Sequence, residues 1–229
     1  LEFLRTAPKD KPWCLSVSFK AVHCQDGAKR QFPPDKRDEK MFADITIPSA
    51  PLSDPAIFQS LHEPLKTSES RRRWEIRFSP KLFQDTVKDY YRLLFGVDRE
   101  LGRLRKELKK LGVADNTVII FTSDHGFYLG ERGLAGKWFA HEESIRIPLI
   151  IHDPRQREKR TQPLTELVLN IDFAPTILSY AGLPAPKSMQ GRSLTPLLAK
   201  SSRDWRSDFF YEHHFIPNRL PESEAVRGQ

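Results

Sequence analysis

The sequence lacks several features that define common protein classes. Its 229 residues include two cysteines, Cys14 and Cys24, which are too few for a disulfide framework, and no Cys/His spacing is typical of a zinc site. We expect both to be small, buried or partly buried thiols. No apolar run reaches the ~18 residues of a membrane-spanning helix, so no membrane partner is expected. The opening LEFLRTAPKD has neither an initiator Met nor a signal-peptide pattern, which indicates a processed or partial chain.

Common catalytic motifs are absent as well. Glycines at 126, 130, 133 and 136 precede Lys137, but Glu131 stands where a Walker loop needs Gly, and Trp138 stands where it needs Ser or Thr. No G-x-G-x-x-G, G-x-S-x-G or H-E-x-x-H segment occurs. The sequence therefore gives no support to the nucleotide-binding, serine-hydrolase or zinc-protease chemistries that use these motifs.

The sequence has an excess of positive charge. The net charge is +7, with basic clusters at residues 36–37, 71–73 and 103–110. Such clusters are compatible with solvated helix faces and loops, which we favour for 103–110, or with attraction to polyanions such as nucleic acid or sulfated glycans. No zinc-finger spacing or RNA-binding aromatic motif is visible, so we expect no nucleic-acid partner.

The spacing of apolar residues predicts one long helix over 79–112. Ser79 is suited to cap it, Pro80 fits its first turn, and Gly112 suits its end. Apolar side chains recur at intervals of four and three residues and form one stripe. The stripe comprises Tyr90, Leu94, Val97, Leu101, Leu104, Leu108 and Leu111.

Other segments predict a sheet. Residues 12–19, 115–124 and 144–154 contain short apolar runs typical of strands, and apolar positions are consecutive in the last two, as in parallel strands covered on both faces. A short helix is predicted over 170–184, with Asp172 at its N-cap and Gly182 at its end. Residues 41–78 are predicted to be an irregular surface excursion, because 44–70 carries four prolines. Alternating helices and apolar strands indicate an α/β fold with a mainly parallel sheet.

An Asp-His pair follows the predicted strand 115–124. Ligands gather at the carboxyl ends of strands in parallel sheets, and Asp124 and His125 stand at such an end. Gly126 lets the backbone turn at once, so both side chains could converge on one ion or substrate. Alternatively, Asp124 caps the turn and His125 is a packed polar residue. Spacing alone favours neither interpretation.

Three blocks, taken together, resemble the sulfatase family. They are KPWCLSVSFKAVH at 11–23, the segment 115–154 that contains SDHGFYLGERGLAGK, and LVLNIDFAPTILSYAGLPAPKSMQGRSLTPLL at 167–198, in the family's order. The resemblance implies an αβα sandwich of the alkaline phosphatase type. It also implies hydrolysis of sulfate esters or sulfamates at a site that holds a calcium ion.

The resemblance assigns roles to four residues. Asp124 matches a calcium ligand, and His125 occupies the next ligand position, where the family has Asn or His. Lys137 matches the lysine that contacts the sulfate of the substrate, where its charge offsets the anion. His23 matches the histidine near the leaving group, where an imidazole can protonate the departing alcohol.

The family's nucleophile is not in this sequence. It is a formylglycine made from Cys or Ser in a C-x-P-S-R or S-x-P-S-R motif, and neither cysteine begins such a motif. We expect that motif to lie N-terminal to residue 1. Residues 1–229 would then be a partial, incomplete catalytic domain that lacks turnover alone, with 200–229 starting a C-terminal subdomain. The family also implies a periplasmic, secreted or lysosomal location.

The sequence thus predicts a calcium-dependent sulfuric ester hydrolase that acts on a sulfated small molecule or glycan. One alternative is a phosphate or phosphonate ester hydrolase of the same superfamily. Another is a non-catalytic module that binds polyanions through its basic surface.

Overall fold

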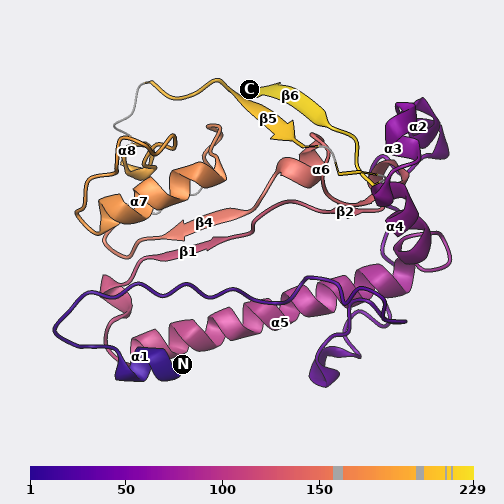
Figure 1. Cartoon of the computed structure of the whole chain (residues 1–229). Helices are drawn as coiled ribbons and strands as arrows, with labels where there is room; N and C mark the ends of the chain where they lie inside the picture. Colours follow the sequence, from indigo (N-terminus) through magenta and orange to yellow (C-terminus); the bar gives the residue numbers. More distant parts are fainter. Residues whose placement is uncertain (157–161, 200–203, 215, 218) are drawn as a thin grey trace. The chain divides into compact units, whose positions relative to one another are not determined.

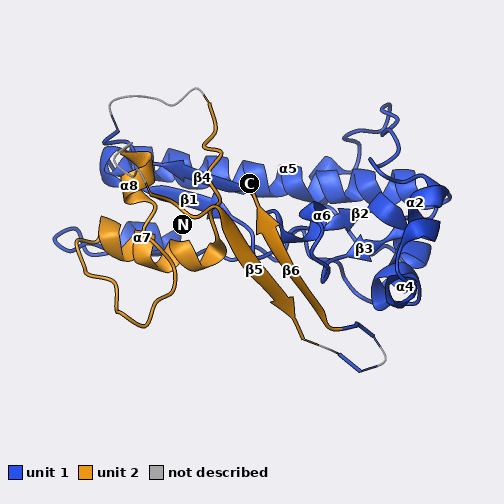
Figure 2. Cartoon of the chain, turned by 90° about the horizontal axis from the view of Figure 1, so that it is seen from above, with its two compact units in different colours: residues 1–157, 216–221 blue, residues 158–215, 222–229 orange. Residues whose placement is uncertain are grey.

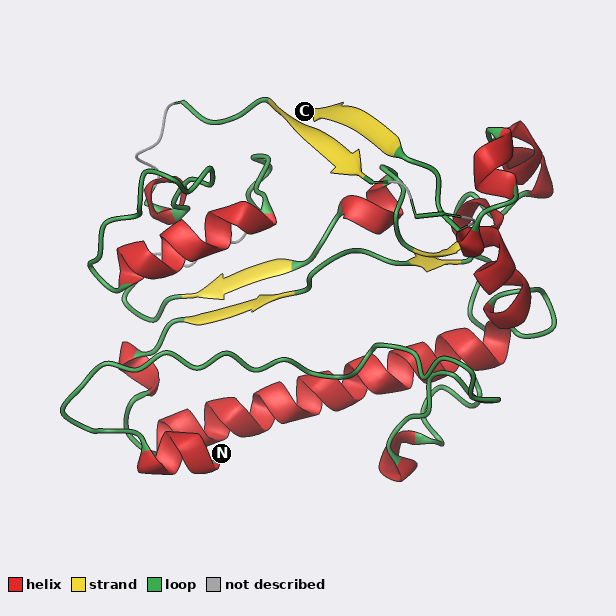
Figure 3. Cartoon of the chain, in the orientation of Figure 1, coloured by secondary structure: helices red, strands yellow, loops and turns green. Residues whose placement is uncertain are grey.

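The computed structural model describes residues 1–156, 162–199, 204–214, 216–217 and 219–229. The chain divides into two compact units, residues 1–157 with 216–221 and residues 158–215 with 222–229 (Figure 2). Helices and strands both occur along the chain, which agrees with the predicted α/β class (Figure 3). In the part that the structure describes, no helix is both long enough and apolar enough to cross a membrane.

The long predicted helix is present as α5, Phe83–Lys110, in the first unit (Figure 1). Val97 and Leu108 of the predicted stripe are buried, whereas Leu94 is 40% exposed. The helix ends where Gly112 takes a φ of +71°. The cap prediction was wrong, because Ser79 offers its carbonyl, and not its side chain, to the Phe83 N–H at 2.9 Å.

Strands β1, Ile119–Thr122, and β4, Leu149–His152, lie within the predicted strand segments. They pair antiparallel, with Ile119 opposite His152, so the parallel arrangement expected for these two strands was wrong. Their consecutive apolar residues indicated burial but carry no information on strand direction. The prediction that both faces of the strand are covered was also wrong for β4, where Ile150 is 62% exposed.

Residues 12–19 form no strand. Strand structure requires a hydrogen-bonded neighbour, and no described segment forms a backbone ladder with this one. Its apolar side chains are accordingly open to solvent, with Leu15 37% and Val17 47% exposed. Cys14 is exposed as well, contrary to prediction, while Cys24 is buried as predicted.

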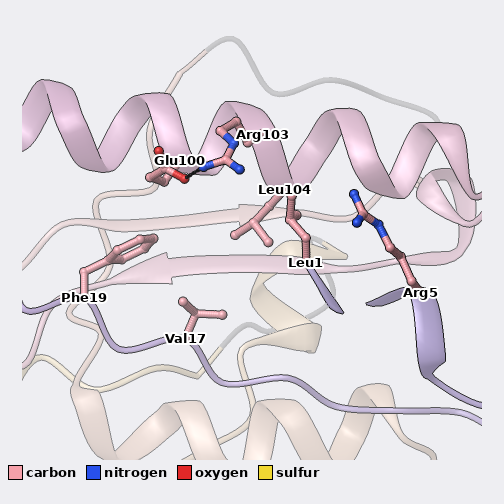
Figure 4. A pocket seen from close by; sticks show the side chains of 7 residues that line it. All are labelled: Leu1, Arg5, Val17, Phe19, Glu100, Arg103 and Leu104. Atoms are coloured by element: carbon pink, nitrogen blue, oxygen red, sulfur yellow. Dashed lines mark hydrogen bonds and ion pairs between the residues drawn. The ribbon is translucent and has the colours of Figure 1, made fainter. Parts of the chain in front are cut away.

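A cavity in the first unit lies between this N-terminal segment and α5 (Figure 4). Apolar side chains and an Arg–Glu pair line it, and none of the four predicted site residues is among them. Its lining comprises Leu1, Arg5, Val17, Phe19, Glu100, Arg103 and Leu104.

Residues 41–78 contain three helices. The prediction that this segment is an irregular surface excursion was therefore wrong. They are α2, Pro55–Ser60, α3, Glu63–Lys66, and α4, Glu69–Arg77. Asp54 caps α2 by accepting the Ala56 N–H at 2.8 Å. Ser68 caps α4 with its hydroxyl oxygen. Prolines and polar residues that indicated a loop occupy the caps and first turns of these short helices.

Two apolar clusters enclose the segment that follows β1. The first contains the buried residues Phe32, Phe78, Val87, Cys24 and Ala135. The second contains Tyr128, Leu134, Phe139 and Leu220. The strands β2, Tyr128–Leu129, and β3, Ala135–Gly136, contribute to both clusters and form an antiparallel hairpin. This hairpin is thereby fixed in the core of the first unit.

The second unit contains α7, Phe173–Tyr180, α8, Thr195–Leu198, and the antiparallel strands β5, Asp208–His213, and β6, Ser223–Gly228. This unit includes residues on both sides of residue 200, and the C-terminal subdomain predicted to start there stays a prediction. Residues 200–203, 215 and 218 of that segment lie outside the described residues.

The buried carboxylate of Asp172 joins several segments of the second unit. It is fully buried at the N-cap of α7, as predicted for its position, but its side chain does not cap that helix. Its carboxylate instead accepts the N–H groups of Leu169 and Arg192, both at 2.8 Å, and pairs with the guanidinium of Arg206. Gly182, with a φ of +71°, follows the end of the helix.

The remaining elements are short. In the first unit they are α1, Glu2–Thr6, α6, Glu142–Ile145, and the 3-10 turns Lys36–Asp38, Ala114–Asn116 and Glu131–Gly133. In the second unit Asn170–Asp172 forms a further 3-10 turn.

Candidate active site

The chain turns sharply after β1. Gly126 lies against the backbone of α6, and its N–H donates to the Ser144 carbonyl at 2.8 Å. A Cβ at this position would lie 2.4 Å from the Glu143 carbonyl oxygen, which is closer than real Cβ atoms come. Only glycine therefore lets the two backbones approach this closely. The approach fixes the orientation of Asp124 and His125 immediately before it.

The structure brings three of the four predicted site residues together. His125 Nε2 lies 3.4 Å from a carboxylate oxygen of Asp124 and 2.6 Å from the Lys137 ammonium nitrogen. The other ring nitrogen, Nδ1, lies 2.7 Å from the Gly126 carbonyl, which can only accept. Nδ1 therefore carries the proton, and Nε2 offers its lone pair to Lys137.

Lys137 projects from the segment directly after β3. Gly130, Gly133 and Gly136 all have positive φ values, of 113°, 66° and 92°, which side-chain-bearing residues rarely adopt. The hairpin is held from outside by α4, whose Ser70 hydroxyl donates to the Ala135 carbonyl at 2.8 Å. These glycines therefore allow the tight turns through which the chain brings Lys137 back to His125.

His23 is placed by a separate loop. Its side chain is exposed, and its Nδ1 lies 2.7 Å from the Cys24 carbonyl, so Nδ1 carries the proton and Nε2 is free. Among the described residues, no hydrogen bond joins His23 to Asp124, His125 or Lys137. The predicted convergence of four side chains is therefore seen for three of them.

Buried polar residues surround the loop between β2 and α6. Burial raises the pKa of the Glu131 carboxyl, although its oxygen accepts the Leu129 N–H at 2.6 Å. Burial also lowers the pKa of His141, so its neutral ring accepts a hydrogen bond from the fully buried Tyr128 hydroxyl at 2.7 Å. Arg132 lies 3.5 Å from Glu143 across the same region. These contacts join the loop to the segment that begins α6.

Asp124 and His125 fit a divalent cation as two of its ligands. The Asp124 side chain is 85% exposed, and one of its oxygens lies 3.4 Å from Nε2 of His125. Calcium takes six to eight ligands, mostly oxygens. Among the described residues, no cluster of three or more His, Cys, Asp or Glu side chains could hold a metal. At this place the described residues therefore offer two candidate ligands, Asp124 and His125.

Comparison with known proteins identifies the family. A family profile described as Sulfatase matches residues 1–183. The chain belongs to the sulfatase family. N-acetylglucosamine-6-O-sulfatase of Bacteroides thetaiotaomicron is 41% identical over 138 residues, which are 59% of this chain and 25% of the relative. Human N-acetylglucosamine-6-sulfatase is 35% identical over 224 residues, which are 93% of this chain and 37% of the relative. The chain thus spans well under half the length of these sulfatases.

Solved structures agree with the sulfatase assignment. A protein solved in complex with its substrate D-glucosamine-2-N,6-O-disulfate superposes with a TM-score of 0.84 at 25% identity, over 99% of this chain and 57% of that one. Phosphonate monoester hydrolase of Agrobacterium radiobacter gives a TM-score of 0.57 at 30% identity, over 61% of this chain and 28% of that one. The predicted alkaline phosphatase-like fold is confirmed, and the family implies a divalent metal and a formylglycine.

The sequence did not reveal the residues that support the site. Ser144 is buried and links Gly126 to Trp138, whose N–H donates to its hydroxyl at 3.0 Å. Arg77, at the end of α4, is only 2% exposed. A local signal for the helices existed in Asp54 and Ser68, each followed by helix-starting residues. No local signal marks an arginine as buried, because its partners are far away in the sequence.

Proposed function

We propose that this protein hydrolyses sulfate esters, with sulfated amino sugars as its substrate class. The observation that carries the proposal is the grouping of Asp124, His125 and Lys137 at the end of β1 in a chain of the sulfatase family. The substrate class rests on the names of the two N-acetylglucosamine-6-sulfatase relatives and on the disulfated glucosamine bound in the similar solved structure.

Lys137 binds the sulfate group in this proposal. Its ammonium contacts Nε2 of His125, and no ion pair with a carboxylate is found for it among the described residues. Its positive charge is therefore available to an anion. The same charge stabilises the negative charge that develops on the ester oxygen in the transition state.

His23 protonates the leaving alcohol in this proposal. The Cys24 carbonyl binds Nδ1–H, so a second proton binds at Nε2; the imidazolium passes that proton to the departing oxygen and returns to the neutral Nδ1–H form. The exposed ring is accessible to a saccharide. An alcohol of a sugar is a poor leaving group, so the proton matters most for this class of ester.

Asp124 and His125 hold the cation, which we propose to be calcium. A bound calcium ion would supply positive charge beside the sulfate. The oxygen of Asp124 suits calcium better than the nitrogen of His125 does, because calcium prefers hard oxygen ligands. Formylglycine would supply the nucleophile, and neither Cys14 nor Cys24 stands in a motif from which it is made.

The test uses the full-length protein that carries this sequence. N-acetylglucosamine 6-sulfate and an aryl phosphonate monoester are offered separately, and sulfate release and phenol release are measured. We expect kcat/KM to be higher for the sulfate ester by at least about tenfold, a difference of ~1.4 kcal/mol in transition-state binding.

A second candidate is phosphonate ester hydrolysis, which the 30% identity to the Agrobacterium enzyme favours. Preference for the phosphonate in the same assay would establish it and reject the first. Turnover of neither ester, combined with salt-sensitive heparin binding that does not need divalent cations, would instead indicate a polyanion-binding module.

A further inference from the structure

Helix α4 contacts both segments that carry the proposed catalytic side chains. Near its start, the Ser70 hydroxyl and the Arg71 guanidinium donate to the Ala135 and Gly133 carbonyls at 2.8 and 3.2 Å. These two carbonyls belong to the hairpin that precedes Lys137. The helix therefore sets the position of the lysine segment from one side.

The other end of α4 holds the loop that begins at His23. Arg77 donates from Nη2 to a carboxylate oxygen of Asp26 and from Nε to the side-chain oxygen of Gln31, both at 2.5 Å. Gln31 in turn accepts the Gln25 N–H through its backbone carbonyl at 2.7 Å. The guanidinium thus ties together both ends of a closed loop.

The contact continues from Asp26 to the ring of His23. The Cys24 thiol donates to the carboxylate oxygen of Asp26 that Arg77 also binds, at 3.3 Å. Burial raises the pKa of this thiol, which keeps its proton available for that bond. The carbonyl of Cys24 then accepts the His23 Nδ1–H at 2.7 Å. One unbroken series of contacts therefore runs from Arg77 to the imidazole.

Burial of Arg77 costs stability, which a purely structural role would not require. Its side chain is 2% exposed, whereas the carboxylate partner Asp26 is 55% exposed. One of its nitrogens, Nη1, is buried without a hydrogen-bond partner in the described structure. Buried charges with incomplete partners cost stability, and an apolar side chain would fill the same space at lower cost.

We propose that Arg77 is a positioning residue for catalysis: through Asp26 and Cys24 it holds the His23 ring in the Nδ1–H tautomer, with Nε2 directed outward. The inference rests on the leaving-group role proposed for His23. It assigns no contact with substrate to Arg77. It adds that α4 fixes the lysine segment and the histidine loop relative to each other.

The first test observes the ring itself. NMR of the histidine ring nitrogens in the 229-residue chain reports which nitrogen of His23 carries the proton. We expect the Nδ1–H form in the wild type and a mixture of tautomers in Arg77→Met and in Asp26→Ala. Asp26→Ala breaks the same series of contacts at an exposed residue. The test therefore still gives a result if Arg77→Met does not fold. The matched control is Arg72→Met, on the same helix, where the arginine is 61% exposed.

The second test is kinetic and uses the full-length protein. General acid catalysis contributes about 10²–10⁴-fold and matters little for activated leaving groups. We expect Asp26→Ala and Arg77→Met to lose at least about tenfold more kcat on a saccharide sulfate than on a nitrophenyl sulfate. In a His23→Ala background, the same substitutions should have less than about a twofold further effect.

The outcomes separate the two proposals. If His23→Ala loses equal activity on both esters, the leaving-group role of His23 fails, and this inference fails with it. If His23→Ala is selective but Asp26→Ala and Arg77→Met are not, and the tautomer of His23 is unchanged in both, only the positioning role of Arg77 is rejected.

Discussion

The ammonium nitrogen of Lys137 lies 2.6 Å from Nε2 of His125. The proton on Nδ1 is bound by the Gly126 carbonyl, so Nε2 has a single lone pair to offer. A divalent cation held by His125 would use the same lone pair. Lys137 and the cation therefore compete for one atom, and binding of the cation releases the lysine.

This competition predicts that Lys137→Met strengthens cation binding by the 229-residue chain. Removal of the neighbouring positive charge should contribute about 1 kcal/mol after solvent screening, or roughly fivefold in Kd. Calorimetry with calcium and manganese measures the change, and both should bind weakly because the described residues offer two ligands at this place. Lys106→Met, an exposed lysine of α5, is the control. Unchanged or weaker binding by Lys137→Met, or tight calcium binding by the wild type, would contradict the proposed cation site.

A second prediction concerns the turn after β1. Gly126→Ala places a methyl group 2.4 Å from the Glu143 carbonyl oxygen, so the backbone of α6 must shift. We expect a loss of about 1–3 kcal/mol in the free energy of unfolding. Gly102→Ala in α5 is the control, because its methyl group meets open space, and it should stabilise the helix by about 0.5–1 kcal/mol. Urea unfolding of both variants measures this, and equal stability of Gly126→Ala and wild type would refute it.

A third prediction concerns acid stability at the start of α4. Hydrogen bonds from Arg72 lower the pKa of Glu69 to about 2 from an ordinary value of 4.5. A lowered folded-state pKa stabilises the protein above the unfolded-state value, and this contribution is lost as the pH falls from about 4.5 toward about 2. Glu69→Gln should therefore be less stable than wild type near pH 7, by about 1 kcal/mol, and the difference should shrink in acid.

Urea unfolding of Glu69→Gln at a series of pH values provides the measurement. Glu63→Gln is the control, since Glu63 is 75% exposed and lies 3.5 Å from Lys66. A difference between Glu69→Gln and wild type that stays constant with pH would show that the ion pair of Glu69 has no part in acid stability.

A fourth prediction concerns exposed apolar side chains. Phe210 and Val226 lie opposite each other in the β5–β6 hairpin and are 59% and 73% exposed. Exposed apolar strand pairs promote association, so we expect the 229-residue chain to self-associate and bind an apolar dye. Phe210→Thr with Val226→Thr should reduce both, while Ile45→Thr, at a lone side chain that is 51% exposed, should not. A wild-type monomer in size-exclusion chromatography, without dye binding, would contradict this.

Much of the fold could be predicted where a local pattern decides the structure. The periodicity of apolar residues was sufficient for α5, because a stripe that is buried on one side fixes a helix by itself. Strand direction was not predictable, since β1 and β4 pair through residues far apart in the sequence, such as Phe121 and Ile150, which are 29 positions apart. The strand expected at 12–19 was wrong for a related reason. A strand depends on its neighbour, and its own sequence does not supply one.

The site could be predicted only in part. Asp124 and His125 were marked by their place after an apolar strand, and Lys137 by the family resemblance, and the structure brings these three together. The role of Arg77 had no signal, because its partner Asp26 lies 51 residues away and burial is a property of the folded chain. The four prolines of 44–70 indicated a loop, but two of them, Pro55 and Pro64, stand in the first turns of helices α2 and α3.

We propose that Lys137, beside Asp124 and His125, belongs to the active site of a sulfate ester hydrolase. Sulfate release from N-acetylglucosamine 6-sulfate by the full-length Lys137→Ala variant tests it most directly, with Lys106→Ala as the matched control. We expect a loss in kcat of about 10²–10³-fold for Lys137→Ala, as for removal of one group that stabilises a developing anion, and none for Lys106→Ala. Wild-type sulfate release by Lys137→Ala would contradict it.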